Sequence, residues 1–402
     1  MELLSIILLV INLIIYIVIL IPVLYFFIFS AASLFFTQKN HTIKVKEKRP
    51  VTVIFPAYQE DNVILNSAVK AIKHKSKLAK LDVLVIADGL QPATVETLRK
   101  EGIQVEEFVN QQGTKAAALD FAMQFIPERT EEIVILDIDN VMKEGFIDHI
   151  LSSKIASNLR IVQGHRTAKN QNTAYAVLDA ISEEVNNSIL RRGHEVLGLS
   201  SSVIGSGFIA DTSLFREEFS GKVTSRGEDK EFELRLLRKG IRIGYDDRAI
   251  VYDEKVQRSE SFYHQRKRWM AIQRDLKRSE VKKAIRSFEH ICNIDYIDKV
   301  YQLLIPPKII IIGVIVAGTL LTTLLTILMQ CGMLSLIQGA WIFLFILLVI
   351  TSITSFPFKY IKKGMALKAV IHLPGVLLLM IRARLNLRKI GTDFIHTKHE
   401  ID

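Results

Sequence analysis

The sequence predicts an α/β domain with a mostly parallel sheet, attached to a membrane by apolar helices at both ends of the chain. Three observations indicate this fold class. Both ends of the 402-residue chain are strongly apolar, the segment from about residue 39 to 300 is charged, and short β-branched runs alternate there with helical patterns. The distribution of apolar residues therefore predicts a membrane protein with a globular insert.

The first apolar run, residues 3–36, is almost uncharged and too long for a helix buried in a soluble domain. It lacks the basic start and the cleavage pattern of a signal peptide, so we interpret residues 1–38 as a retained N-terminal transmembrane anchor. The positive-inside rule places the basic residues that follow it in the cytosol: Lys39, Lys44, Lys46, Lys48 and Arg49.

Two apolar runs near the other end, residues 309–329 and 337–356, are each long enough to span a bilayer and are joined by a short connection. Lys359, Lys362 and Lys363 follow the second run, which places its end on the cytosolic side as well. We therefore expect a multi-pass protein of the cell membrane whose globular insert, residues 39–290, is cytosolic.

Two segments leave alternatives open. Residues 365–381 are apolar but interrupted by Pro374 and flanked by basic residues, so within the C-terminal part, residues 309–402, they form either a re-entrant or interfacial helix or a third span. Residues 291–308 contain a stretch, 296–304, that we interpret as an interfacial helix. The alternative is an ordinary helix packed on the globular domain.

The globular insert reads as strands that alternate with helices. Strands are expected at 51–55, 81–87, 105–109 and 133–136, and helices at 62–74, 94–101 and 115–125. Such alternation is typical of a parallel sheet covered by helices on both faces.

The net charge of +10 does not indicate a nucleic-acid partner. The basic residues gather at the ends of the apolar segments rather than along a surface with interleaved aromatic residues. Anionic membrane lipids are the simpler partner.

Polar residues follow the expected strands, at the edge of the sheet where ligands bind in this class. Tyr58 and Glu60 follow the first strand, Asp88 the second, and Asp137 and Asp139 the fourth. Carboxylates at one edge would repel one another unless a cation or a hydroxyl-rich ligand lay between them. Asp137 and Asp139 suit one Mg²⁺ or Mn²⁺ that also binds a diphosphate. The alternative for this pair is an ordinary turn or helix cap.

Seven short motifs in order give the chain a family resemblance. It resembles glycosyltransferase family 2, in the membrane-integrated branch that includes cellulose, chitin, hyaluronan and poly-N-acetylglucosamine synthases. The motifs are Pro56-Ala-Tyr-Gln-Glu60, Ala87-Asp-Gly89, Gly113-Thr-Lys115, Asp137-Ile-Asp-Asn140, Gly205-Ser-Gly207, Gly227-Glu-Asp229 and Gln265-Arg-Lys-Arg-Trp269.

The resemblance implies a Rossmann-like catalytic domain of the GT-A type and a role for each matching residue. It implies nucleotide binding by Ala57, Tyr58, Glu60, Asp88, Lys115 and Asp137, and metal binding by Asp139. It implies that Asp229, next to Glu228, is the general base, and that Gln265, Arg268 and Trp269 bind the acceptor. The alternatives are purely structural: Asp229 only offsets a helix dipole, and Trp269 and its basic neighbours face lipid.

The chemistry implied is an inverting, metal-dependent hexosyl transfer from a nucleotide-sugar, with UDP as the expected carrier. A base is needed to take the proton of the acceptor hydroxyl, and a cation and an arginine to stabilise the departing diphosphate. The acceptor is expected to be a growing polysaccharide. Transfer of one sugar to a lipid or lipid-linked oligosaccharide is the first alternative, and an inactive subunit of an export complex is the second.

Two residues and the membrane part of the chain depart from the family pattern. Gly227 stands where Thr or Ser is usual before Glu-Asp, and Gln59 where Asn is usual before Glu60. The chain also offers fewer membrane helices than the polymer-secreting synthases, so a pore would need a homo-oligomer or an export partner.

Overall fold

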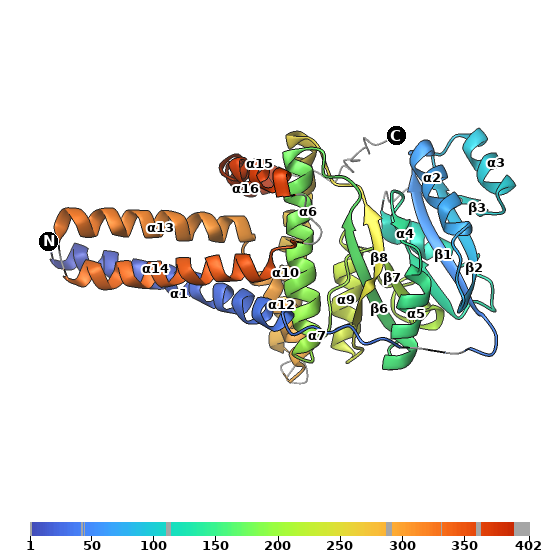
Figure 1. Cartoon of the computed structure of the whole chain (residues 1–402), viewed down its shortest axis with the longest axis horizontal. Coiled ribbons are helices and arrows are strands. Elements are labelled where there is room, and N and C mark those ends of the chain that lie inside the picture. The colour runs from blue at the N-terminus through green and yellow to red at the C-terminus, as the bar shows by residue number, and fades with distance from the viewer. Residues whose placement is uncertain are drawn as a thin grey trace.

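The structure is a computed structural model, which describes residues 2–41, 43, 45–109, 114–286, 292–330, 332–358 and 363–389. Four residues used in the predictions above, Lys44, Gly113, Lys359 and Lys362, lie outside the described residues. The chain forms a long bundle of apolar helices with an α/β domain at one end (Figure 1). We call the bundle the stalk.

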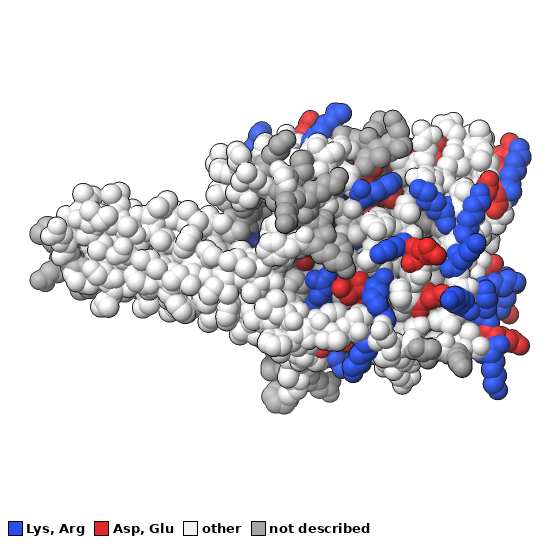
Figure 2. Space-filling view, in the orientation of Figure 1, with Lys and Arg blue, Asp and Glu red and all other residues white. Residues whose placement is uncertain are grey.

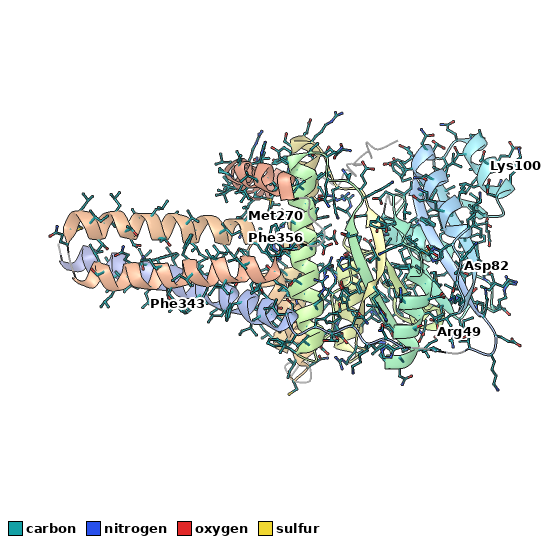
Figure 3. The ribbon with its side chains drawn as sticks, in the orientation of Figure 1. Arg49, Asp82, Lys100, Met270, Phe343 and Phe356 are labelled. Atoms are coloured by element: carbon teal, nitrogen blue, oxygen red, sulfur yellow. The ribbon has the colours of Figure 1, made fainter. Side chains whose placement is uncertain are left out.

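The stalk consists of α1 (Glu2–Ser33), α13 (Lys308–Met329) and α14 (Gly332–Ser355). Within the described residues, three helical stretches are long and apolar enough to cross a membrane, Leu9–Ser33, Lys308–Met329 and Leu334–Ser355. They correspond to the predicted runs at 3–36, 309–329 and 337–356. Charged side chains gather on the α/β domain, whereas the visible face of the stalk shows none (Figure 2). Phe343, which is 49% exposed, projects from α14 in this stalk (Figure 3).

The C-terminal apolar stretch forms two short helices, α15 (Lys363–Ile371) and α16 (Leu373–Leu385), which separate at His372 just before Pro374. Proline lacks the N–H that would continue α15 and is favoured in the first turn of a helix, which explains why one helix ends and another begins here. With 9 and 13 residues, neither helix has the length of a candidate span. Val376 and Met380 of α16 pack against Met270 of the long helix α10 (Ser259–Arg286).

The sheet has eight strands in the order β3-β2-β1-β4-β7-β6-β8-β5. One half is parallel and contains the four predicted strands, β1 (Arg49–Tyr58), β2 (Ala79–Asp88), β3 (Gln104–Glu107) and β4 (Glu132–Ile135). The other half was not predicted. It contains β6 (Ile161–Ala168), β7 (Phe208–Asp211), β8 (Gly244–Asp253) and the short β5 (Val141–Met142), with β7 antiparallel to both of its neighbours.

Helices cover both faces of the sheet, because alternate residues of a strand point to opposite sides. Val53 of β1 faces a core shared with α2 (Asp61–Ile72), α3 (Pro92–Lys100) and α5 (Phe146–Ser157). Ile54 faces a second core shared with α4 (Lys115–Ala122), α8 (Thr212–Glu218) and α9 (Glu228–Arg238). The predicted α/β class with a mostly parallel sheet is confirmed.

Four elements join the domain to the stalk: α6 (Ala174–Asn187), the π-helix η1 (Ser188–Gly193), α7 (His194–Val196) and α12 (Ile294–Leu304). Helix α12 lies where 296–304 was expected to be helical, and it packs on both parts. Tyr296 and Val300 are buried in the domain core. On its other side, Asp298 accepts a hydrogen bond of 2.7 Å from the hydroxyl of Tyr25 in α1. A short 3-10 turn, η2 (Asn386–Lys389), ends the described chain.

Candidate active site

A cavity of about 970 Å³ opens at the carboxyl ends of β1 and β4 and extends to the base of the stalk. Five elements or their flanking loops line it with predicted site residues. These are Tyr58, Lys115, Asp137, Asp139, Glu228, Asp229, Gln265, Arg268 and Trp269. The structure therefore brings together residues that are up to about 210 positions apart in the sequence, as expected for strand ends and loops that meet at one edge of a sheet.

Ala57, Glu60 and Asp88 do not line this cavity, but they lie beside it. Tyr58 and Asp88 are register partners at the ends of β1 and β2, and Ala57 pairs with Ala87. The N–H of Gln59 donates to the carbonyl of Asp88 at 3.0 Å. Gln59 has a φ of 50°, a left-handed conformation that turns the chain sharply after β1 and leads into Glu60.

The two aspartates after β4 sit in a tight turn held by Asn140. The N–H of Asn140 donates to the carbonyl of Asp137 at 2.9 Å, and the N–H of Asp137 donates to the side-chain oxygen of Asn140 at 3.1 Å. Asp139 is only 4% exposed. Its carboxylate accepts hydrogen bonds from the Asn140 amide at 3.1 Å and from the N–H of Glu254 at 2.5 Å. The turn thus fixes both carboxylates at the end of a buried strand.

Lys115 forms a positive centre at the end of the cavity beside Asp137. It is the first residue of α4, after Thr114, whose hydroxyl caps the helix by accepting from the N–H of Ala117. Its ammonium group pairs with Asp137 and donates to the carbonyl of Gly205 at 2.8 Å. Burial opposes the charge of Lys115, but the carboxylates of Asp137 and Glu228 outweigh burial and raise its pKa.

Arg166 was not predicted, although it is central to the site. It extends from β6, ion-pairs with Glu183 at 3.1 Å and Asp253 at 3.3 Å, and lies 3.7 Å from a carboxylate oxygen of Asp137. Burial raises the pKa of the Asp137 carboxyl, but Lys115 and Arg166 together lower it below its ordinary value. Arg166 belongs to none of the seven motifs and lies on a strand that was not predicted, so no sequence pattern indicated its place in the site.

Glu228 and Asp229 begin α9, where backbone N–H groups favour negative charge. A side-chain oxygen of Asp229 accepts from the N–H of Lys230 at 2.8 Å. Gly227, just before them, explains one departure from the family pattern. A Cβ at Gly227 would lie 2.2 Å from the side chain of Ile272 in α10, so glycine lets the start of α9 approach α10.

Glu228 has an unusual proton affinity. Burial, with a smaller contribution from the charges of Asp229 and Asp137, raises the pKa of Glu228 to about 7, although Lys115 opposes the shift from 3.8 Å away. The unfolded chain would hold this proton less tightly. The carboxyl therefore destabilises the fold progressively as the pH rises from about 4.5 to about 7.

Glu228→Gln, which mimics the protonated acid, is expected to gain stability relative to the wild type across this pH window. The gain should reach about 1–3 kcal/mol, at about 1.4 kcal/mol per pKa unit, and then level off. Thermal unfolding of the purified protein between pH 5 and 8 measures it. Glu231→Gln, on the same helix but outside the cavity lining, is the control, and a difference that does not change with pH would contradict the pKa of Glu228.

Gln265, Arg268 and Trp269 share one face of α10 because they lie three and four residues apart. The side-chain oxygen of Gln265 is buried and has no hydrogen-bond partner among the described residues. Arg268 has no ion pair with any carboxylate in the described part of the chain, and burial lowers its pKa. Both groups are thus available to a ligand.

Trp269 is 39% exposed, but one of its faces is already covered. The guanidinium of Arg266, which also pairs with Asp179, lies 4.4 Å from the centre of the indole ring. The opposite face of the indole is therefore the one that a ligand in the cavity could stack on.

The carboxylates in the cavity fit a hard divalent cation that is bound partly by the protein and partly by a phosphate-containing ligand. Among the described residues, no group of three or more His, Cys, Asp or Glu side chains is arranged to hold a metal. Asp139 nevertheless offers carboxylate oxygens at the cavity wall, with Asp137 beside it. Mg²⁺ and Mn²⁺ are commonly held by one or two carboxylates, with phosphate oxygens and water completing the shell.

Comparisons with known proteins agree with this architecture. Residues 132–372 match the family described as "Glycosyl transferase family group 2". A mannosyltransferase from Pyrobaculum calidifontis, solved in complex with GDP-Man and Mn²⁺, is 15% identical, with a TM-score of 0.51 and coverage of 84% of this chain and 97% of that chain. At this identity the likeness shows the fold, and it confirms the GT-A class.

Two further solved structures are similar over part of the chain. Glucosyl-3-phosphoglycerate synthase from Mycobacterium tuberculosis is 15% identical, with a TM-score of 0.39, and the match covers 53% of this chain and 74% of that chain. TarS from S. aureus is 13% identical, with a TM-score of 0.37, and the match covers 56% and 65% of the two chains. No functionally curated protein matches the chain.

Proposed function

This chain belongs to glycosyl transferase family group 2, and we propose that it is an inverting, metal-dependent hexosyltransferase that moves a sugar from a nucleotide-sugar to a glycan acceptor at a membrane. One observation carries the proposal. A single cavity contains the two aspartates after β4, the carboxylate pair of α9 and Arg268, which forms no ion pair among the described residues, and the same cavity reaches the base of the stalk. These are the groups that a donor diphosphate and an acceptor hydroxyl require at one place.

The donor end of the cavity is proposed to bind the nucleotide diphosphate. Tyr58, with Ala57, Glu60 and Asp88 beside it, would contact the base and ribose, and Lys115 and Asp137 would lie near the phosphates. Arg268 supports this assignment because its guanidinium has no carboxylate partner among the described residues. Charge-assisted hydrogen bonds from guanidinium to phosphate are strong and directional.

The transfer step is proposed as a single displacement. Asp229 takes the proton of the acceptor hydroxyl while that oxygen forms a bond to the anomeric carbon of the sugar. The bond from that carbon to the diphosphate breaks on the opposite side, which inverts the configuration, and Arg268 and Lys115 stabilise the charge that leaves with the diphosphate. Gln265 and the open face of Trp269 would position the acceptor.

Asp139 is proposed to hold the metal. A bound Mg²⁺ or Mn²⁺ would neutralise the diphosphate charge that develops during transfer. Asp139→Ala is expected to weaken Mn²⁺-dependent binding of the nucleotide-sugar by roughly tenfold or more, since a charged ligand to the metal is lost. Calorimetric titration of the donor with and without Mn²⁺ measures the effect, with Asp82→Asn, remote from the cavity, as control. Equal Mn²⁺ dependence in the Asp139 variant and the wild type would contradict the assignment.

The membrane-integrated branch of the family and a cytosolic active site are also proposed. The three candidate spans and the basic residues at their ends support a catalytic domain on the cytosolic face of the cell membrane. The acceptor is then either a growing polysaccharide or a glycan carried on a lipid. The reach of the cavity to the base of the stalk favours an acceptor that remains at the membrane.

Product length separates these functions. Membranes that contain the full chain would be incubated with radiolabelled UDP-glucose, UDP-N-acetylglucosamine, UDP-galactose, UDP-glucuronate or GDP-mannose, and membranes without the chain serve as control. A long ladder of products indicates polysaccharide synthesis, whereas one added sugar indicates transfer to a lipid-linked acceptor. If no nucleotide-sugar in a broad panel supports transfer, the proposed function is wrong. The remaining hypothesis is then an inactive subunit of an export complex.

A further inference from the structure

Two cations at the stalk end of the cavity, one buried and one half-buried, donate hydrogen bonds to neutral oxygens. Arg191 is 1% exposed, and its guanidinium donates to the carbonyl of Ser202 at 3.2 Å and to the side-chain oxygen of Asn187 at 2.6 Å. The ammonium group of Lys308 donates to the side-chain oxygen of Asn186 and lies 5.1 Å from the ring centre of Phe26. Within the described residues, neither cation forms an ion pair.

The deeper part of the same cavity is different. There, Lys255 pairs with Glu183 and Asp253, each at 2.6 Å, and Arg166 pairs with the same two carboxylates. A buried charge without a counter-ion is strongly unfavourable, because protein cannot replace the water it has lost. The cations in the deep part of the cavity are therefore paired directly with carboxylates, whereas Arg191 and Lys308 at the stalk end form no such pair among the described residues.

A third cation, Lys299, adds to the positive charge at the stalk end of the cavity. Lys299 is 3% exposed and lies 3.3 Å from Asp298, but this carboxylate also accepts hydrogen bonds from Tyr25 and Gln302. Burial lowers the pKa of Lys299, despite the opposing charge of Asp298. The buried carboxylate of Glu233 adds negative charge near Lys299 and Arg191. We call the three basic side chains, Arg191, Lys299 and Lys308, the stalk-end cluster.

The backbone fixes Arg191 in this position. Arg191 lies on the π-helix η1, an uncommon geometry that is frequent at functional sites. Gly193, at the end of η1, touches the backbone of α1, since a Cβ there would lie 2.1 Å from the carbonyl oxygen of Phe29. The backbone of η1 is therefore held against the first stalk helix, and this contact fixes the place from which the buried Arg191 side chain extends.

The surroundings of the stalk-end cluster are apolar. Phe26, Leu190, Ile305, Pro306 and Pro307 line the cavity there. Phe26 belongs to one candidate membrane span, and Lys308 begins another. A ligand at this place meets positive charge on the cavity side and apolar helices on the other, so it should combine an anionic group with an apolar chain.

We propose that the stalk-end cluster binds the phosphate or diphosphate group of a membrane lipid, an ester of a long apolar alcohol, whose chain lies along the base of the stalk. Arg191 and Lys308 bind the phosphate oxygens directly, and Lys299 adds positive charge behind them. The inference rests on the proposed function and deepens it, because the glycan on such a lipid would extend from the stalk end toward Asp229.

Direct binding tests this inference without any need for turnover. The full chain, purified in detergent, would be titrated with farnesyl phosphate, farnesol and inorganic phosphate, and binding followed by native mass spectrometry. Farnesyl phosphate is expected to bind at least about tenfold more tightly than either partial ligand, since only it satisfies both the cations and the apolar wall. Lys308→Met and Arg191→Gln should each weaken it by about tenfold.

Lys100→Gln is the matched control, because it removes one positive charge from α3 at the far end of the molecule (Figure 3). Lys308→Met, at the half-buried cation, keeps the test valid if the fully buried Arg191 variant does not fold. Equal binding of farnesol and farnesyl phosphate, or unchanged binding by Lys308→Met, would overturn the inference. Equal binding of inorganic phosphate would show a free-anion site and overturn the lipid assignment. Normal lipid binding without sugar transfer would instead count against the proposed function alone.

Discussion

Asp229→Asn is expected to reduce sugar transfer by about 10²–10⁴-fold while donor affinity changes little, because general-base catalysis contributes a factor of this size. Asparagine has nearly the same shape as aspartate and can still accept the hydrogen bond from the N–H of Lys230. It cannot take a proton from the acceptor hydroxyl. Initial rates with radiolabelled donor, together with calorimetric donor binding, measure the two properties separately.

Two neighbouring variants make this experiment specific. Glu231→Gln removes a carboxylate from the same helix start, but Glu231 binds the N–H groups of Thr224 and Ser225 and does not line the cavity, so its rate should stay near that of the wild type. Glu228→Gln tests the adjacent carboxyl. If Asp229→Asn turned over normally while Glu228→Gln lost transfer, Glu228 would be the base.

The parallel half of the fold could be predicted because its strands are simple in sequence. In β1 and β4, buried β-branched runs end in polar residues, and the helices between them show clear periodicity. Bounds differ by only a few residues, as for β2, predicted at 81–87 and observed as Ala79–Asp88. Local sequence patterns were therefore sufficient to predict the strands and helices of this half.

The other half could not be predicted because its core contains buried polar residues. In β6, Gln163, His165 and Arg166 interrupt the apolar pattern. His165 is fully buried and contacts Glu184 at 2.9 Å and Asp247 at 2.8 Å, which lie 19 and 82 positions away. Buried polar residues are stabilised by hydrogen bonds to such distant partners, and a local stretch of sequence does not show which partners they will have.

The candidate site divides in the same way. The residues that a short motif marks, such as Asp139 and Asp229, could be found in the sequence, and they line one cavity. Arg191 and Lys308 belong to no motif, and Arg191 enters the cavity through a π-helix, a geometry with no simple sequence pattern. Gly227 departs from the family pattern, and the structure explains it, because glycine permits the close contact with Ile272.

Gly193→Ala is expected to destabilise the protein by about 1–3 kcal/mol or more, the range for overpacking a tight contact. The added Cβ would lie 2.1 Å from the Phe29 carbonyl oxygen and 2.9 Å from its carbonyl carbon. These are backbone atoms, so a side-chain rotation cannot relieve the clash. The π-helix and α1 must move apart, which also disturbs the stacking of Phe29 on His194, whose ring centres are 3.9 Å apart. Thermal unfolding in detergent measures the loss as a lower Tm.

Gly339→Ala is the matched control, because Gly339 is also helical and a Cβ there meets nothing within 4 Å. Alanine favours helix over glycine by about 1 kcal/mol, so this variant should be as stable as the wild type or slightly more so. The contact at Gly193 also positions Arg191, two residues earlier on η1. Gly193→Ala should therefore weaken farnesyl phosphate binding along with stability, while donor binding at Lys115 and Arg268 stays close to normal. A Tm equal to that of Gly339→Ala would mean that α1 and the π-helix do not pack as closely as the structure has them.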